Sequence, residues 1–187
     1  VLRAGWGFRE LREVTRGKAK VTATVNWRVA MEHQPLYDAV ETVHDGDVKQ
    51  RLLAIGVLQT HVDSHTLGRD ELNALTDSLV LLLGENNFKL CVKALRVAST
   101  ALAQAGDHSK AMAPLLVPAL IERLGDGKAA VRTGALEAIF VIIDGLHSPN
   151  IVHERFASCW RHKNGHIREG ILKIAIYCFN KYGAKFT

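Results

Sequence analysis

The segment Val131-Arg132-Thr133-Gly134-Ala135-Leu136 opens an apolar helical pattern directly after a polar turn. The same apolar-then-basic order recurs in three other segments: Val48-Lys49-Gln50-Arg51-Leu52-Leu53, Leu90-Cys91-Val92-Lys93-Ala94-Leu95 and Ile167-Arg168-Glu169-Gly170-Ile171-Leu172. Counted from their first residues, the four copies recur about every 40 residues, which is the period of units built from two or three helices. Such units stack into a solenoid, and solenoids are usually binding surfaces rather than enzymes.

Helices alternate with short turns from Pro35 onward. Proline suits a helix start, and Asp45-Gly46-Asp47 ends the first helix. The spacing of apolar residues predicts further helices over 48–62, 69–83, 109–124 and 150–161, and others that end near Ala105, Gly145 and Tyr182. Pro114 and Pro118 should bend the helix over 109–124 or restart it at Pro114.

These elements predict an all-α fold, an α-solenoid of HEAT-like helix pairs with repeats at 33–65, 66–106, 107–147 and 148–187. Residues 1–32 do not keep a helical period, and we expect a leader or linker there. This leader is basic, with seven Lys and Arg against three Glu, whereas the rest of the chain is nearly neutral. The high pI therefore does not by itself indicate that the repeats bind nucleic acid. Because the chain starts at Val1 rather than Met, we expect it to be an excerpt of a longer protein.

The composition also narrows the class of protein. No apolar run reaches the roughly 18–20 residues that a membrane span needs. The cysteines are odd in number, and all three fall within helical patterns. We expect them to be reduced and buried, as in an intracellular protein: Cys91, Cys159 and Cys178.

No pattern points to catalysis, a cofactor or a bound metal. A Gly-x-Ser-x-Gly motif is absent, and the turn over 125–128 lacks the spacing of a phosphate loop. Cys159, His162 and His166 form a C-x2-H-x3-H pattern, but a zinc finger separates its ligand pairs by about a dozen residues.

Two aromatic residues and two histidines that could suggest binding sites are expected to have structural roles. Phe156 and Trp160 share an apolar stripe and are expected in the core. His61 and His65 share a helix face and are expected to be surface or capping residues.

Stacking would place the turn inside each repeat beside the equivalent turn of the next. The turns are 45–47, 84–87, 125–128 and 162–166. Their side chains would form a row of cations and amides with one exposed aromatic, which suits an acidic protein surface: Lys49, Asn87, Phe88, Lys89, Lys128, Arg132, Lys163, Asn164, His166 and Arg168. The alternative is that they are turn formers and solvated charges. In that case Arg132 and Arg168 would pair with a turn carboxylate such as Asp126 and brace the stack.

Two stretches in the second half carry a family resemblance. The first is Leu116-Val117-Pro118-Ala119-Leu120-Ile121-Glu122-Arg123-Leu124-Gly125-Asp126-Gly127-Lys128-Ala129-Ala130-Val131-Arg132. The second combines Ser148-Pro149-Asn150-Ile151-Val152-His153-Glu154-Arg155 with His162-Lys163-Asn164 and Ile167-Arg168-Glu169-Gly170. In this order they resemble the third and fourth repeats of a TOG domain of the CLASP type, and Asn86-Asn87-Phe88-Lys89 resembles the second-repeat turn. The resemblance covers about residues 36–183.

The resemblance implies a HEAT-repeat paddle without enzymatic activity, whose turns bind αβ-tubulin or the microtubule lattice along one edge. CLASP proteins use such domains to promote rescue, suppress catastrophe and stabilise microtubules. Carried over by position, the tubulin-binding residues would be Lys49, Asn87, Phe88, Lys89, Lys128, Lys163, Asn164 and His166. The resemblance implies a place in the cytoplasm on the microtubule cytoskeleton, with the cilium or axoneme as a further location. No cofactor, nucleic acid or membrane is expected as a partner.

Three departures from the family keep a second function open. Gly165 stands where the family often has an aromatic residue, the first turn lacks a common tryptophan, and four repeats are legible where the family has about six. Gly165 and the missing tryptophan favour weak tubulin binding, or contact with the polymer lattice rather than the free dimer. Gly165 and the missing repeats favour a HEAT-repeat scaffold that binds another protein within a cytoskeletal or axonemal assembly, without direct tubulin contact. An RNA-binding helical repeat fits less well, because the repeats are nearly neutral and expose few aromatics.

Overall fold

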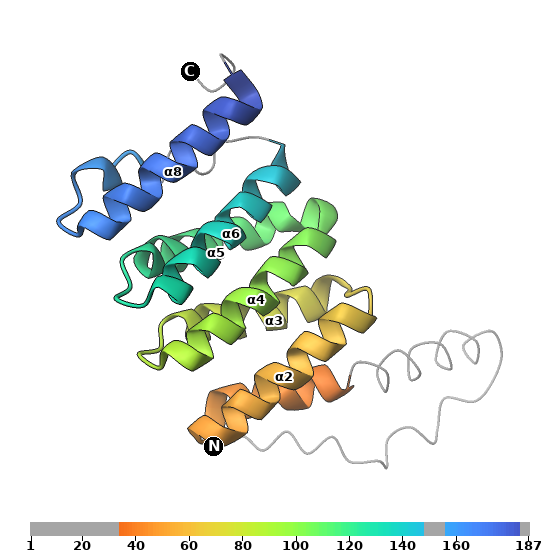
Figure 1. Ribbon diagram of the computed structural model, residues 1–187. Coiled ribbons are helices and arrows are strands. Elements are labelled where there is room, and N and C mark those ends of the chain that lie inside the picture. The colour runs from red at the N-terminus through yellow and green to blue at the C-terminus, as the bar shows by residue number, and fades with distance from the viewer. Residues whose placement is uncertain (1–33, 148–155, 184–187) are drawn as a thin grey trace, which may run out of the picture. The chain divides into compact units, whose positions relative to one another are not determined.

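The computed structural model describes residues 34–147 and 156–183, and within these ranges the chain forms helices and turns and no strand (Figure 1). The predicted all-α fold is confirmed. A helix covers 34–45. The later elements are α2 (Val48–Ser64), α3 (Arg69–Leu83), α4 (Phe88–Gln104), η2 (Gly106–His108), α5 (Ser109–Leu124), α6 (Ala129–Leu146), η3 (Cys159–Arg161) and α8 (Gly165–Tyr182). The expected leader lies outside the described residues, and the domain boundaries stay predictions.

The helices stack in two layers. In one layer α2 packs against α4, α4 against α6, and α6 against α8, as the nearly parallel row of ribbons in Figure 1 shows. In the other layer α3 packs against α5. Contacts of α3 with α4 and of α5 with α6 join the layers within each repeat. This is the architecture of a HEAT-like solenoid, in which each repeat contacts its neighbours.

The core consists of the apolar stripes of these helices. In α3 the stripe of Leu72, Leu75, Leu79 and Leu82 is buried, as its spacing predicts. Burying each of these side chains contributes about 1.5–3 kcal/mol relative to exposure. All three cysteines are buried free thiols, which confirms their expected environment. None of the described helices is both long and apolar enough to cross a membrane.

The two prolines do not divide α5, which continues as one helix from Ser109 to Leu124. Of the two predicted outcomes, a restart at Pro114 is therefore wrong, and a bend stays a prediction. Pro114 and Pro118 are four residues apart and both exposed, so they lie on the same solvent-facing side. The carbonyl groups that lose their helical N–H partner therefore lie where water can reach them, and the helix continues.

Three smaller expectations also need correction. Trp160 is 44% exposed, while Phe156 on the same stretch is buried. The predicted helix over 150–161 does not reach its expected end, since residues 157–158 form a turn and η3 follows. His61 is buried rather than superficial, and its ring stacks on that of His65 at 4.1 Å between centroids. His65 is the C-cap residue of α2, as expected for one of the pair.

The first copy of the sequence motif is also out of register. The N-cap residues of the four helices, which are structurally equivalent, are Asp47, Asn87, Lys128 and Asn164. Counted from these caps, Gln50 and not Val48 corresponds to the buried Leu90, Val131 and Ile167. Val48 is accordingly 48% exposed. The sequence motif misled because an apolar residue two positions early imitates the start of the pattern.

Candidate functional site

Hydrogen bonds between repeats hold the four predicted turns side by side. Arg51, in the first turn of α2, donates from Nη2 to Oε1 of Glu85 at 2.7 Å. Arg123 donates from Nη1 to the Glu85 carbonyl at 3.3 Å. Asn164 donates from Nδ2 to the Gly125 carbonyl at 2.8 Å. The turns therefore line one edge of the stack, on the left of Figure 1. We call the segments 45–51, 84–91, 123–132 and 162–168 the turn ridge.

Several ridge side chains serve the helix starts. Asp47 accepts a hydrogen bond from the backbone N–H of Gln50, whose side chain accepts one in return from the Asp47 N–H, which makes a capping box. Asn87 caps α4 by accepting from the Lys89 N–H at 3.0 Å, and Asn164 caps α8 by accepting from the His166 N–H at 2.9 Å. The amides predicted as partner contacts thus have a capping role, and Asn164 uses both ends of its amide inside the protein.

Arg132 and Arg168 make the same contact in successive repeats. Arg132 donates from Nη1 to the carbonyls of Asp126 and Gly127, at 2.8 and 3.1 Å. Arg168 donates from Nη1 to the carbonyls of His162 and Lys163, at 2.6 and 3.1 Å. Each arginine therefore closes the turn that precedes its own helix through carbonyl oxygens, rather than through the turn carboxylate that the sequence suggested.

The carboxylate of Asp126 bonds elsewhere. Its Oδ2 lies 3.3 Å from Nη1 of Arg123, and its Oδ1 accepts from the backbone N–H of Lys128 at 2.7 Å. Asp126 thus shapes the third turn and offsets the charge of a half-buried arginine. Arginines neutralise the negative charges of both Asp126 and Glu85. The solvent-exposed charge of this part of the ridge therefore comes mainly from the lysines.

The exposed side chains of the ridge are mainly lysines and one aromatic ring. Phe88 is 42% exposed, and the ammonium group of Lys128 lies 5.6 Å from its ring centroid, across the gap between two turns. This is within the range of a cation–π contact. Lys49, Lys89 and Lys163 are exposed.

His166 differs from these lysines, because its Nδ1 lies 3.8 Å from Oε2 of Glu169. Hydrogen bonding to Lys173 lowers the pKa of Glu169, and His166 adds a smaller contribution in the same direction. Glu169 therefore stays ionised at neutral pH, so a negative charge stands beside His166 at this end of the ridge.

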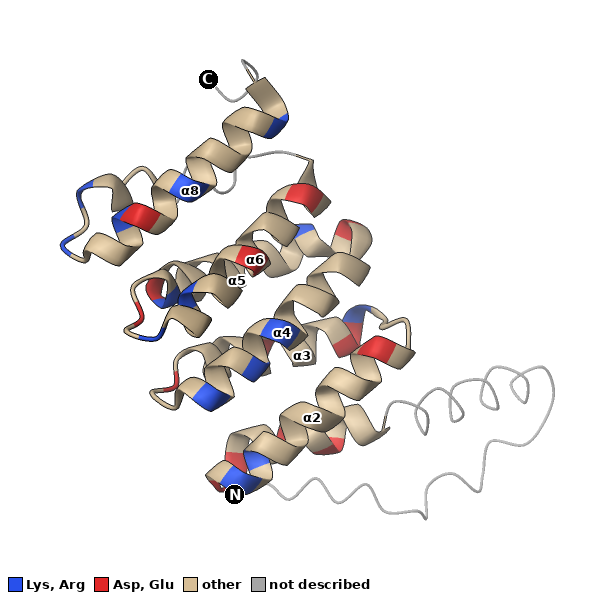
Figure 2. Ribbon diagram, in the orientation of Figure 1, with Lys and Arg blue, Asp and Glu red and all other residues tan. Residues whose placement is uncertain are grey.

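Figure 2 shows how charge is distributed along the stack. Basic residues colour the ridge-side ends of α2 and α4 and the turns that precede α6 and α8. Acidic residues are interspersed, so the ridge is not uniformly positive. A surface of this kind suits a partner with acidic groups in matching places better than one that offers only diffuse negative charge.

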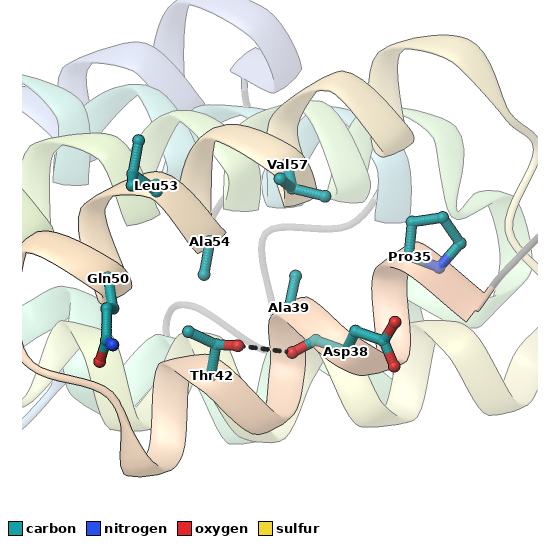
Figure 3. A pocket seen from close by; sticks show the side chains of 8 residues that line it. All are labelled: Pro35, Asp38, Ala39, Thr42, Gln50, Leu53, Ala54 and Val57. Carbon is teal, nitrogen blue, oxygen red and sulfur yellow. Dashed lines mark hydrogen bonds between the residues drawn. The ribbon is translucent and has the colours of Figure 1, made fainter.

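A groove extends from the first turn of the ridge, with which it shares Gln50. It lies between the helix over 34–45 and α2 and has a volume of about 410 Å³ (Figure 3). The lining is mostly apolar, with one carboxylate: Pro35, Asp38, Ala39, Thr42, Gln50, Leu53, Ala54 and Val57. Acid–base or nucleophilic catalysis would need a second reactive group beside that carboxylate. In the described ranges, no group of three or more His, Cys, Asp or Glu side chains could hold a metal ion.

Three residues that hold the turns together were not predicted as site residues from the sequence: Arg51, Glu85 and Arg123. Arg51 and Arg123 lie in or beside apolar helical patterns, where a charge that is only 12% or 19% exposed needs a partner. A basic residue within an apolar helical pattern was therefore the sequence feature that could have indicated these two arginines. Glu85 itself looks like an ordinary turn residue, because its partners come from other repeats.

Comparisons with known proteins bear on the identity of this stack. No family model matches the chain. A "CLIP-associated protein" of Arabidopsis thaliana is 35% identical over 135 residues, or 71% of this chain and 9% of that protein. "CLIP-associating protein 1" of Xenopus tropicalis is 29% identical over 102 residues, or 54% of this chain and 7% of that protein. The chain is homologous to CLIP-associating proteins.

The match to these CLIP-associating proteins is local, since the chain spans less than a tenth of their length. The "CLIP-associating protein" of Drosophila melanogaster is a further relative, 26% identical over 66% of this chain. Among solved structures, the "MAST/Orbit N-terminal domain" superposes with a TM-score of 0.72 and 22% identity, covering 80% of this chain and 67% of that one. This likeness confirms the TOG-type, HEAT-like solenoid fold that the sequence resemblance implied.

Proposed function

We propose that the chain is a non-enzymatic, microtubule-associated module that binds αβ-tubulin or the microtubule lattice through the turn ridge. In this role it would regulate the growth or stability of microtubules in the cytoplasm. The observation that carries the proposal is the linkage of four turns into one ridge that exposes Phe88 and a lysine from each repeat. Homology to CLIP-associating proteins supports the proposal. These relatives are, by name, members of the CLASP family that the sequence resembles.

The ridge has the properties that an acidic protein partner requires. Complementary charge speeds encounter and selects the partner, whereas an aromatic side chain at the centre of the contact supplies affinity. Phe88 lies on the second of the four turns with Lys128 over its ring, so the aromatic is flanked by cations. Cap bonds and arginine contacts fix the backbone beneath these side chains, and a preordered surface loses less entropy on binding.

A co-sedimentation assay with taxol-stabilised microtubules tests the proposal. The variant with Lys128→Glu and Lys163→Glu should bind at least about tenfold more weakly, because each change replaces attraction by repulsion. A matched control with Arg69→Glu and Lys110→Glu makes the same change in net charge at exposed positions away from the turn ridge. Equal losses in the two variants, or no loss in the first, would reject the ridge as the contact.

Size-exclusion chromatography with free tubulin separates the forms of the hypothesis. Co-elution indicates binding to the dimer, and pelleting without co-elution indicates binding to the lattice. If neither occurs, the second candidate remains, which is a scaffold within a larger cytoskeletal assembly. The exposed apolar residues of α8 favour it, since Leu172, Ile176 and Phe179 are 53–60% exposed and could pack against another protein.

A further inference from the structure

The second turn of the ridge lacks the arginine that closes the third and fourth turns. Counted from the N-caps, Arg51, Cys91, Arg132 and Arg168 are equivalent positions. Arg132 and Arg168 each close their own turn through its carbonyls. In the second repeat the arginine is replaced by Cys91, whose thiol donates to the Glu85 carbonyl at 3.1 Å. A thiol is a weak donor, so this turn lacks the strong internal contact of the other two.

Two arginines from adjacent repeats reach the second turn instead. Arg51 does not close its own turn but extends to the Glu85 carboxylate at 2.7 Å. Arg123 comes from the other side and donates to the Glu85 carbonyl at 3.3 Å. Glu85 is therefore the point where the first, second and third turns meet, and Phe88 follows it by three residues.

Burying the two arginines costs free energy of desolvation. We infer from this cost that the contacts of Arg51 and Arg123 with Glu85 do more than stabilise the fold. Arg51 is largely buried, and the Nε atoms of Arg51 and Arg123 are buried without a hydrogen-bond partner among the described residues. Buried ion pairs often stabilise no better than apolar side chains of the same volume, but they select one geometry over others. The geometry selected here is the spacing of three turns that carry exposed side chains.

We propose that Arg51, Glu85 and Arg123 are positioning residues, which fix the second turn relative to its neighbours and so place Phe88 beside Lys128 for partner binding. This inference rests on the proposed function for its effect on tubulin, and on the structure alone for its effect on the turn. The arginines act through Glu85 and need not contact the partner themselves.

The test uses a variant that keeps net charge constant, with Arg51→Met and Glu85→Gln. Both side chains keep nearly their size, and the change leaves long-range attraction to an acidic partner intact. We expect an about tenfold weaker Kd for tubulin with an unchanged dependence of binding on salt. A changed salt dependence would mean that Arg51 contacts the partner directly and would overturn the positioning role.

Coupling to Phe88 is the second measurement. If the network places Phe88, the Phe88→Ala substitution should weaken binding less in the Arg51→Met, Glu85→Gln background than in the wild type. Equal effects in both backgrounds would overturn the inference. The matched control combines Arg96→Met with Glu137→Gln, because both residues are exposed, lie beyond the turns, and together leave the net charge constant.

Hydrogen exchange without tubulin separates this inference from the proposed function. The Lys89 and Cys91 N–H groups bond within the second turn, to Asn87, and they should exchange faster in the double variant. The Arg168 N–H, which bonds to Asn164 in the fourth turn, should not change. Unchanged exchange at Lys89 and Cys91 would overturn the inference even if tubulin binds. If the double variant does not fold, Glu85→Gln alone is used in the exchange measurement, where the same outcomes apply; it is not used in the salt test, because it changes the net charge.

Discussion

The side-chain amide of Asn164 donates a hydrogen bond of 2.8 Å to the backbone carbonyl of Gly125, one repeat earlier in the solenoid. A Cβ on Gly125 would lie 2.7 Å from Nδ2 of Asn164 and 2.9 Å from Cγ1 of Ile167. The absence of a side chain at Gly125 is therefore what allows the fourth repeat to pack this closely on the third.

Gly125→Ala should destabilise the protein because Asn164 and Ile167 must both move. We expect a loss of about 1–3 kcal/mol in the free energy of unfolding, measured by urea denaturation. Gly127→Ala is the control, since a Cβ there meets no atom within 4 Å. If the two variants are equally stable, the close approach between the repeats is wrong.

Asn164→Ala should also lower stability, because it removes the cap bond to the His166 N–H and the bond to Gly125. We expect a loss of about 1–2 kcal/mol, measured by thermal or urea unfolding. Asn164→Asp keeps an oxygen that can cap α8 but removes the donor to Gly125, so its loss should be smaller. Equal losses for Ala and Asp would argue against the capping contribution.

Asp144 at the end of α6 makes stability depend on pH. Partial burial opposes its ionisation, but hydrogen bonds from Lys181 and Tyr177 outweigh burial and lower the pKa of Asp144. A carboxyl group whose pKa is lower in the folded state stabilises the protein above the unfolded pKa, near 4, and loses this effect as pH falls through the folded value.

Asp144→Asn should therefore reduce stability at pH 7 and have little effect near pH 2. Because Asp144 is about half exposed, we expect no more than about 1 kcal/mol at pH 7. Urea denaturation at both pH values measures the difference. Asp77→Asn, at an exposed position on α3, controls for the change in net charge, and a constant effect of Asp144→Asn at all pH values would contradict the ion pair.

Phe88 and Phe156 should respond to truncation in opposite ways. Phe156 is 5% exposed, so Phe156→Ala should cost about 3–5 kcal/mol in stability. Phe88 is 42% exposed, so Phe88→Ala should cost less than about 1 kcal/mol but weaken tubulin pelleting. Unchanged pelleting by a folded Phe88→Ala variant would remove the aromatic from the proposed contact.

Local sequence patterns were sufficient to predict most of the fold. The leucine spacing of α3 predicted its bounds at 69–83, and polar turns at a period of about 40 residues predicted the stacking. The register of the first repeat could not be read in this way, because Val48 is apolar yet exposed. The continuity of α5 was also hidden, since the cost of Pro114 depends on whether water reaches the carbonyl that it frees.

The candidate site was only partly visible in the sequence. The sequence could indicate which residues lie on turns, and therefore Phe88 and the lysines, but the partners of those turns come from other repeats. Glu85 and Arg123 are 38 residues apart, and nothing local joins them. Asn164 illustrates the same limit, because its side chain could have faced a partner or the preceding turn, and the structure places it on the Gly125 carbonyl. Whether the ridge lysines contact tubulin stays a prediction.

The regular stacking of helices in one layer also sets a constant spacing between the turns of the ridge. Neighbouring helices pack about 8–10 Å apart, so the turns that carry Lys49, Lys89, Lys128 and Lys163 recur at steps of roughly that size. A surface whose acidic groups repeat at the same interval can engage every step at once. On a surface with a different interval, the acidic groups would no longer align with the turns after one or two steps. Such a surface would bind weakly, however negative its total charge.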